Sequence, residues 1–384
     1  MGELIGRFLT TRVIYHGPGA LERLEGEIHK LGGQRPALFT DPGVARAGLR
    51  DRALAAARMD LPCFELIPAE PSYEVVEQGV RALREQGSDV IVALGGGSVI
   101  DTAKMAAVMM TNAGRVPDYF GPDRVPRAGI PVIAIPTTAG TGSEVSPSSV
   151  FVDPADQTKK GVRSDFILPQ VAILDPTLTL SLPPSLTAST GMDALTHAIE
   201  CYTARRATLL SDLVAEEAIR LIARNLLTAY ATGADLSARE GMLMGSLLAG
   251  MALATANVGA VHGLAQTLGG QFRVPHGVAN ALLLPQVMAF SRIACREKYA
   301  KVAALLGEGV EGLDLDEASQ RAITAVQSLI RALGLPQRLR ELGVPEDALG
   351  TLAAKCLQTQ ARIVNNNPRT MSVQEAEEIL RQAY

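Results

Sequence analysis

The sequence predicts a protein of two parts, an α/β domain with a mostly parallel sheet followed by a domain made of helices. Over the first half of the chain, short apolar runs alternate with helical segments, which is the pattern of a right-handed parallel sheet. After Leu186 the apolar residues recur with helical periodicity and almost no strand pattern remains. We place the boundary at Pro183-Pro184, which gives domains of residues 1–182 and 183–384.

Length and composition limit the classes of protein to consider. A chain of 384 residues exceeds one typical hydrophobic core and suggests about two domains. The formal net charge of −4 offers no basic surface for nucleic acid or for an anionic membrane. Four cysteines lie far apart in the sequence, as expected for reduced thiols in a cytoplasmic protein. The N-terminus has an early acid and no apolar run, so we expect no signal peptide.

The strands expected in the first domain are short and apolar. A continuous apolar run at 89–94 is typical of a strand that is buried on both faces of a parallel sheet. We predict strands at 12–15, 36–40, 63–67, 89–94 and 131–135, with helices that end near 31 and 58 and helices at 73–86 and 99–110. Two later runs, 150–153 and 171–174, we expect to form a hairpin or an edge of the sheet.

The second domain is predicted to consist of helices. They are expected at 186–204, 208–231, 237–256, 260–268, 277–291, 295–305, 315–333, 346–363 and 372–383. Residues 241–272 contain no Asp, Glu, Lys or Arg and could span a bilayer by length alone. Several glycines and polar residues interrupt that segment, and therefore two buried helices of a soluble domain explain it better.

Two glycine-rich turns follow predicted buried strands. The first is Gly95-Gly96-Gly97-Ser98 with Asp101 in the helix that follows, and the second contains Thr137, Thr138 and Thr141. Glycines permit close backbone approach, and a helix N-terminus offers free N–H groups to an anion such as pyrophosphate. Each turn alone could be a simple tight turn, because the spacing is not G-x-G-x-x-G. Two such turns at the carboxyl ends of strands in one sheet favour a nucleotide in a Rossmann-like site.

Asp41 ends another predicted strand. A carboxylate at that edge could accept hydrogen bonds from ribose hydroxyls and repel a 2′-phosphate, which would favour NAD over NADP. In this chain the acid precedes the glycine turn, whereas the usual order places it afterwards. The alternative is that Asp41 belongs to the Asp-Pro-Gly turn that starts the next helix.

A candidate metal site begins at Asp193 and His197, which lie four residues apart in a predicted helix. That spacing places both side chains on one face, about one turn apart. Such a pair alone is also common without a metal. Two further histidines, His262 and His276, lie beside glycines in nearly uncharged segments. One carboxylate and three imidazoles suit Fe(II) or Zn(II) and leave coordination positions open.

Long motifs in the same order along nearly the whole chain carry a resemblance to a known family. They are residues 95–104 (GGGSVIDTAK), 136–144 (PTTAGTGSE), 175–176 (DP), 191–200 (GMDALTHAIE), 262–265 (HGLA), 275–285 (PHGVANALLLP) and 367–369 (NPR). The chain resembles the iron-containing (group III) alcohol dehydrogenases, whose fold is also that of dehydroquinate synthase. The resemblance implies an NAD(P)-binding α/β domain, an all-helical domain and a metal in the cleft between them.

The resemblance also implies roles for particular residues. The metal ligands carry over to Asp193, His197, His262 and His276, and we take His262 and His276 as the catalytic residues. The cofactor-binding positions carry over to Asp41, Gly95, Gly96, Gly97, Ser98, Asp101, Thr137, Thr138 and Thr141. Lys159, which lies beside Lys160, is added to this set because of its spacing to Pro169. The cofactors expected are NAD, with NADP as the alternative, and Fe²⁺, with Zn²⁺ as the alternative. Members of the family are commonly homodimers or larger homo-oligomers.

The predicted activity is that of an oxidoreductase, an NAD(P)-linked alcohol dehydrogenase or aldehyde reductase. Hydride would pass between a small alcohol at the metal and the nicotinamide. Two positions depart from many members, because Gln266 and Gln286 stand where histidines are often found, which puts the proton route and the substrate range in question. The alternative is a metal- and NAD-dependent lyase of the dehydroquinate-synthase type, whose phosphorylated substrate would require more Lys and Arg near the ligand segments.

Overall fold

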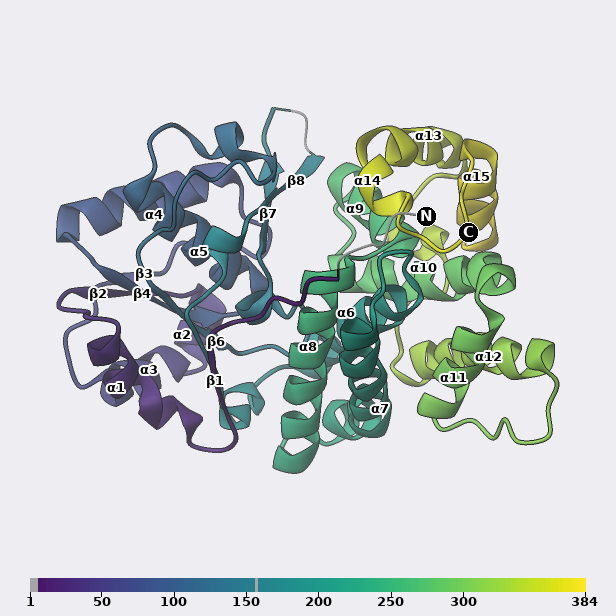
Figure 1. The fold of residues 1–384 in the computed structure, drawn as a ribbon, viewed down its shortest axis with the longest axis horizontal. Helices are drawn as coiled ribbons and strands as arrows, with labels where there is room; N and C mark the ends of the chain where they lie inside the picture. Colours follow the sequence, from purple (N-terminus) through teal and green to yellow (C-terminus); the bar gives the residue numbers. More distant parts are fainter. Residues whose placement is uncertain (1–5, 156–157) are drawn as a thin grey trace. The chain divides into compact units, whose positions relative to one another are not determined.

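The computed structural model describes residues 6–155 and 158–384 and divides into two compact units. The α/β unit contains residues 10–182 and 233–244. The helical unit contains residues 183–232 and 245–384, with the described residues 6–9. Figure 1 draws the α/β unit mainly in purple and blue and the helical unit mainly in green and yellow. The predicted fold class, a parallel α/β part and a helical part, is confirmed.

In the described part of the α/β unit, the main sheet has six strands that are all parallel to their neighbours. In spatial order they are β1 (Val13–His16), β9 (Val171–Leu174), β6 (Val132–Pro136), β4 (Val90–Gly95), β2 (Pro36–Phe39) and β3 (Cys63–Phe64). Every residue of the four interior strands is buried. Burial on both faces explains why these strands appear in the sequence as continuous apolar runs.

Helices cover both faces of this sheet. They are α1 (Leu24–Lys30), α2 (Pro42–Arg46), α3 (Leu49–Ala57), α4 (Tyr73–Gln86) and α5 (Gly97–Thr111). Alternate side chains of one strand enter different apolar clusters, because successive residues point to opposite faces. Phe39 of β2 packs with residues of α4 and α5, whereas Leu38 packs with residues of α1 and α3. The sheet is therefore the middle layer of three.

One strand prediction is wrong. Residues 171–174 form neither a hairpin nor an edge, because β9 lies between β1 and β6 and is parallel to both. The antiparallel pairing is instead made by β7 (Ser148–Asp153) and β8 (Thr158–Arg163), with β5 (Gly121–Pro122) beside β8 in a separate sheet. The segment β8 was not predicted as a strand, since Thr-Lys-Lys-Gly-Val-Arg has little of the apolar pattern that indicates one.

The helical unit agrees closely with the predicted helices. Its helices are α6 (Pro184–Thr203), α7 (Leu209–Ala231), α9 (Ala260–Phe272), α10 (His276–Ser291), α11 (Arg296–Leu305), α12 (Leu315–Ala332), α13 (Leu349–Thr359), α14 (Ala361–Val364) and α15 (Val373–Gln382). The single helix predicted at 346–363 is instead two, separated at Gln360. Helix α6 starts at Pro184, where a proline costs no hydrogen bond because the first N–H groups of a helix have no partner inside it.

The uncharged segment 241–272 folds into part of α8 (Leu236–Ala256) and all of α9, which are bent by 101° at the break between them. Asn257, in that break, has a φ of 63°. By length and composition, this pair and the stretch His276–Ala294 each resemble a membrane span, a test that core helices of soluble proteins also pass. The apolar side chains of α9, such as Leu264 and Leu268, are almost fully buried in the folded chain.

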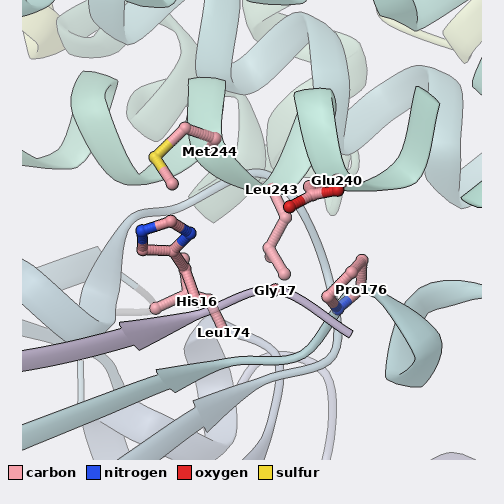
Figure 2. Close-up of a pocket in the computed structure, with 7 residues that line it drawn as sticks. All are labelled: His16, Gly17, Leu174, Pro176, Glu240, Leu243 and Met244. Carbon is pink, nitrogen blue, oxygen red and sulfur yellow. The ribbon is translucent and has the colours of Figure 1, made fainter. Parts of the chain in front are cut away.

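The first turns of α8 pack on the α/β unit rather than on the helical one. Figure 2 shows Leu243 and Met244 of α8 facing His16 and Leu174, which end β1 and β9, around a small pocket. The buried guanidinium of Arg239 fixes this turn, since it donates to the carbonyls of Gly233 and Leu182 at 2.9 and 3.1 Å. Residues 233–244 therefore belong to the α/β unit, although they are distant from the rest of it in the sequence.

Glu144, which is buried beside Lys104, should make the stability of the protein depend on pH. Burial raises the pKa of Glu144 from 4.5 to about 7. The folded state thus keeps a proton that the unfolded state releases, and stability falls as the pH rises from about 4.5 to 7, by about 3 kcal/mol. In Glu144→Gln, whose side chain is neutral at every pH, the melting temperature should rise relative to wild type across this window.

Thermal unfolding of both proteins at pH 5 and pH 8 measures this difference. Glu22→Gln, at an exposed glutamate, is the control and should follow wild type at both pH values. If the melting temperatures of wild type and Glu144→Gln changed by the same amount between pH 5 and pH 8, the prediction would be contradicted.

Candidate active site

Three helices of the helical unit bring predicted metal ligands together. Asp193 lies on α6, His262 lies in the first turn of α9, and His276 is the first residue of α10. Figure 1 shows where α6, α9 and α10 run within this unit. One ligand atom from each of the three residues lies within 4.8 Å of the other two. Oδ1 of Asp193 is 3.6 Å from Nε2 of His262 and 3.7 Å from Nε2 of His276.

The close approach of α10 to α6 depends on Gly277. A Cβ at this position would lie 2.2 Å from the carbonyl oxygen of Ser189 on α6, closer than any real side chain can approach. Because His276 precedes Gly277 directly, the glycine allows the imidazole to reach Asp193.

The side-chain amide of Asn280 lies at the centre of the three ligands. Its Nδ2 is 2.6 Å from Oδ1 of Asp193 and 3.1 and 3.2 Å from Nε2 of His262 and His276. An amide has two N–H protons, so it cannot donate to three acceptors at once. Its Oδ1 is buried and has no hydrogen-bond partner among the described residues. A set of one carboxylate oxygen and imidazole nitrogens around one point suits a divalent iron or zinc ion.

The electrostatics of this cluster favour positive charge. Burial raises the pKa of Asp193, but the three neighbouring imidazoles outweigh burial and lower it below its usual value. Burial lowers the pKa of His262, but the carboxylates of Asp193 and Glu200 outweigh burial and raise it to about 9. Both shifts mean that a cationic charge is stabilised among these groups, and a metal ion supplies that charge once it displaces the proton.

The fourth predicted ligand is placed differently. The ring of His197 stacks on that of His262, with centroids 4.5 Å apart and an angle of 23° between the planes. His197 is buried, but it is not in the group whose ligand atoms lie within 4.8 Å of one another. Its role as a ligand therefore remains a prediction.

Sequence reasoning assigned no role to Glu200 and Asn280, which contact the ligands directly. Glu200 accepts from Nδ1 of His262 at 2.5 Å. A signal for both was present, because Glu200 lies three residues after His197, and Asn280 lies four residues after His276. These spacings place each side chain on the same helix face as the ligand.

The start of α9 is held by a residue near the C-terminus. Nδ2 of the buried Asn366 lies 2.9, 3.1 and 2.9 Å from the carbonyl oxygens of Ala256, Asn257 and Val258. Ala256 is the last residue of α8, and Asn257 and Val258 lie in the break between α8 and α9. Asn366 thus fixes the turn from which the helix that carries His262 begins.

In the α/β unit, the two glycine-rich turns lie side by side. They follow β4 and β6, which are neighbours in the sheet, with Gly95 opposite Pro136. A Cβ on Gly96 would lie 3.3 Å from Oγ1 of Thr138, and a Cβ on Gly97 would lie 2.6 Å from Cγ2 of Thr141. The glycines therefore let the N-terminus of α5 approach the threonines closely, with its first N–H groups at the carboxyl ends of the strands.

Asp41 lies at the same edge of the sheet, since β2 is the neighbour of β4 on its other side. Although Asp41 precedes the glycine turn in the sequence, the two therefore lie at the same edge of the sheet. Its side chain caps α2, as the alternative in the sequence analysis expected: Oδ1 accepts from the N–H groups of Gly43 and Val44 at 2.7 and 3.0 Å. Both of these bonds use Oδ1.

Three other predicted cofactor residues make contacts within the unit. Asp101 accepts from Oγ of Ser143 at 2.5 Å and from the N–H of Val150 at 2.9 Å. Ser98 donates to the carbonyl of Ala69, and Lys159 pairs with Glu70 at 2.7 Å. These contacts hold the side chains in place, and direct contact with a cofactor remains a prediction for each of them.

Lys104, to which the sequence motifs gave no role, holds the segment that follows the second turn through hydrogen bonds. Its buried Nζ donates to the carbonyls of Ser143, Ser146 and Ser148 and lies 3.0 Å from Oδ1 of Asp101. Because Lys104 and Asp101 both lie on α5, the helix that follows the first turn also holds the segment that follows the second.

Comparisons with known proteins agree with this combination of a parallel α/β sheet and a buried Asp/His cluster. A family model described as iron-containing alcohol dehydrogenase matches residues 11–176. A second model, for the C-terminal part of the iron-containing alcohol dehydrogenase family, matches residues 187–384. The chain belongs to the iron-containing alcohol dehydrogenase family.

Individual relatives match over almost their full length. The 1,3-propanediol dehydrogenase of Klebsiella pneumoniae is 40% identical, with 98% of each chain covered. The lactaldehyde reductase of Escherichia coli is 34% identical, with 99% of this chain and all of the relative covered. A crystal structure of a 1,3-propanediol oxidoreductase superposes with a TM-score of 0.97 at 40% identity, covering 99% of this chain and 100% of the other.

The contact between Gly97 and Thr141 leads to a prediction about cofactor binding. In Gly97→Ala, the new methyl group must displace Thr141 and separate the two turns. Such overpacking costs about 1–3 kcal/mol, so we expect NADH to bind roughly tenfold more weakly or worse. Fluorescence titration with NADH measures the dissociation constant.

Gly26→Ala, in the same unit, is the matched control, because a Cβ there meets no atom within 4 Å. It should bind NADH as wild type does. Equal affinity of Gly97→Ala and wild type would show that the two turns do not hold the cofactor.

Proposed function

We propose that this protein is a metal-dependent, NAD(P)-linked alcohol dehydrogenase that also reduces aldehydes. The observation that carries the proposal is the convergence of Asp193, His262 and His276 on one point in the helical unit. Membership of the iron-containing alcohol dehydrogenase family supports it. The names of relatives, which include dehydrogenases of 1,3-propanediol and long-chain alcohols and a lactaldehyde reductase, support small alcohols and aldehydes as substrates.

In this proposal Asp193, His197, His262 and His276 hold the metal, and His262 and His276 are catalytic through that role. A divalent ion held there supplies Lewis acidity, which lowers the pKa of an alcohol and, in the reverse direction, polarises a carbonyl. The partly buried side chain of Gln266 lies one turn after His262 and cannot carry a proton as a histidine does. The side chain at position 266 would therefore not relay the proton of the alcohol, and water or a bound cofactor would have to take that role.

The α/β unit is proposed to hold the nicotinamide cofactor, which exchanges the hydride. The N–H groups at the start of α5 would bind pyrophosphate, with Gly95, Gly96, Gly97 and Ser98 forming the turn. Thr137, Thr138 and Thr141 contribute hydroxyls from the second turn, and Asp101 and Lys159 complete the set. Oδ2 of Asp41 would be available to accept from a ribose hydroxyl, since the capping bonds use Oδ1.

Several finer features belong to the same proposal. The metal is Fe²⁺, with Zn²⁺ as the alternative, and the cofactor is NAD, with NADP as the alternative. The protein is cytoplasmic and forms a homodimer or a larger homo-oligomer, and it binds neither nucleic acid nor membrane. The cofactor-binding part is residues 1–182 and the metal-binding part is residues 183–384, except that residues 233–244 belong to the α/β unit and residues 6–9 to the helical unit.

The lyase alternative is not retained. The curated relatives that match over nearly the whole chain are named as dehydrogenases and reductases. The segments around His262 and His276 also lack the cluster of Lys and Arg that a phosphorylated acid would need.

The proposal is tested by loading the protein with Fe²⁺ or Zn²⁺ and following nicotinamide absorbance with small alcohols, diols and aldehydes. His262→Ala removes a ligand, so aldehyde reduction with NADH should fall by about a thousandfold or more, because metal catalysis contributes several kcal/mol. His29→Ala, at an exposed histidine of the α/β unit, should keep wild-type activity. Undiminished activity in His262→Ala would rule out the metal mechanism.

A second variant tests the choice of cofactor. Asp41→Ser keeps an oxygen that caps α2 but removes the charge that would repel the 2′-phosphate of NADP. The ratio of kcat/KM for NADPH to that for NADH should rise by about tenfold or more, which corresponds to roughly 1.4 kcal/mol. An unchanged ratio, in a variant that melts as wild type does, would exclude a ribose contact at Asp41.

A further inference from the structure

We propose that Glu200 is a positioning residue for the metal centre and sets the tautomer and the direction of His262. The inference rests on the proposed function, because it concerns a ligand of the proposed metal site. Glu200 would not touch the metal or the substrate. It would act by holding the imidazole so that Nε2 presents a lone pair to the cation.

The carboxylate of Glu200 makes two directed contacts in a buried place. Its Oε2 lies 2.5 Å from Nδ1 of His262, and its Oε1 accepts from the N–H of Val261 at 2.7 Å. The residue is 5% exposed. A carboxylate has no proton to donate, so a hydrogen bond at 2.5 Å requires the proton to be on Nδ1.

The geometry on the other side of the ring fits this tautomer. With the proton on Nδ1, the neutral imidazole has its lone pair on Nε2. That nitrogen faces the cluster, at 3.6 Å from Oδ1 of the ligand Asp193 and 3.1 Å from Nδ2 of Asn280. Glu200 and the proposed metal therefore lie at opposite nitrogens of His262, in the arrangement of carboxylate, histidine and metal found in other metalloproteins.

The backbone at the start of α9 is built around this carboxylate. Val261 is the second residue of the helix, so its N–H has no acceptor inside the helix. Gly259, the residue just before the helix, leaves the room: a Cβ there would lie 3.1 Å from Oε1 of Glu200. One carboxylate from α6 thus both caps α9 and orients the ligand in its first turn.

Glu200→Gln separates these two roles. The amide oxygen can still accept from Val261 and cap the helix, but the amide nitrogen now faces Nδ1 of His262. An N–H donor there requires a lone pair on Nδ1, which moves the proton to Nε2, where the metal must bind. We expect the dissociation constant for metal to rise by about 10–100-fold, with little change in the melting temperature of the metal-free protein.

The experiment is a titration of the metal-free protein with Co²⁺, followed by its visible absorption and by competition with a chelator of known affinity. Glu216→Gln is the matched control, since Glu216 accepts from the hydroxyl of Tyr202 in the same unit and lies outside the cluster. It should bind Co²⁺ as wild type does. Because the readout is metal affinity, it does not depend on the choice of alcohol.

Each outcome of the Co²⁺ titration either supports or contradicts the role proposed for Glu200. Weaker Co²⁺ binding in Glu200→Gln, at an unchanged melting temperature, supports the inference. Wild-type affinity in Glu200→Gln overturns it and leaves Glu200 as a helix cap, while the proposed metal centre stands. Failure of the wild-type protein itself to bind Co²⁺ would overturn the metal centre and this inference together.

Discussion

The buried carboxylate of Asp193 is the constraint on which the candidate active site depends. A negative charge away from water is costly unless cationic or hydrogen-bonding groups surround it. Here α9 and α10 each start beside α6 and direct an imidazole towards Asp193, and Asn280 donates a hydrogen bond to it at 2.6 Å. The packing of three helices is therefore inseparable from the chemistry that the cluster can perform.

The α/β unit brings loops from distant parts of the chain to one edge of its sheet. Parallel strands all end on the same side, so the neighbours β2, β4 and β6 present Asp41, the glycine turn and the threonine turn together. The buried Lys104 and the partly buried Asp101 then tie the helix after one turn to the segment after the other. Rigid support of this kind is what allows irregular backbone to bind a ligand with defined geometry.

Much of the fold followed from local patterns, and the exceptions have physical causes. Helix positions were predictable because long runs of helix-forming residues, bounded by glycine and proline, are local features of the sequence. The place of β9 was not, because the partner of a short apolar strand is decided by long-range packing rather than by its own residues. The break at Gln360 was missed for a similar reason: the helical pattern continues through it, although the backbone does not.

Contacts within the candidate active site were likewise only partly predictable from local sequence patterns. His262 and His276 could be paired with Asp193 through their motifs, yet neither the stacking of His197 on His262 nor the bond from His262 to Glu200 follows from spacing alone. Asn280 and Glu200 lie on the ligand faces of their helices, so a search for polar residues one turn from each ligand would have found them.

The contact of Asn366 with the break before α9 gives the C-terminal region a part in the chemistry. Three carbonyl oxygens at this break point towards one amide group from a residue more than a hundred positions later. The residues that lead into the helix of His262 can make these contacts only in a chain that extends as far as Asn366. A chain that stopped before Asn366 would leave these carbonyl oxygens without the amide, immediately before the first turn that carries His262.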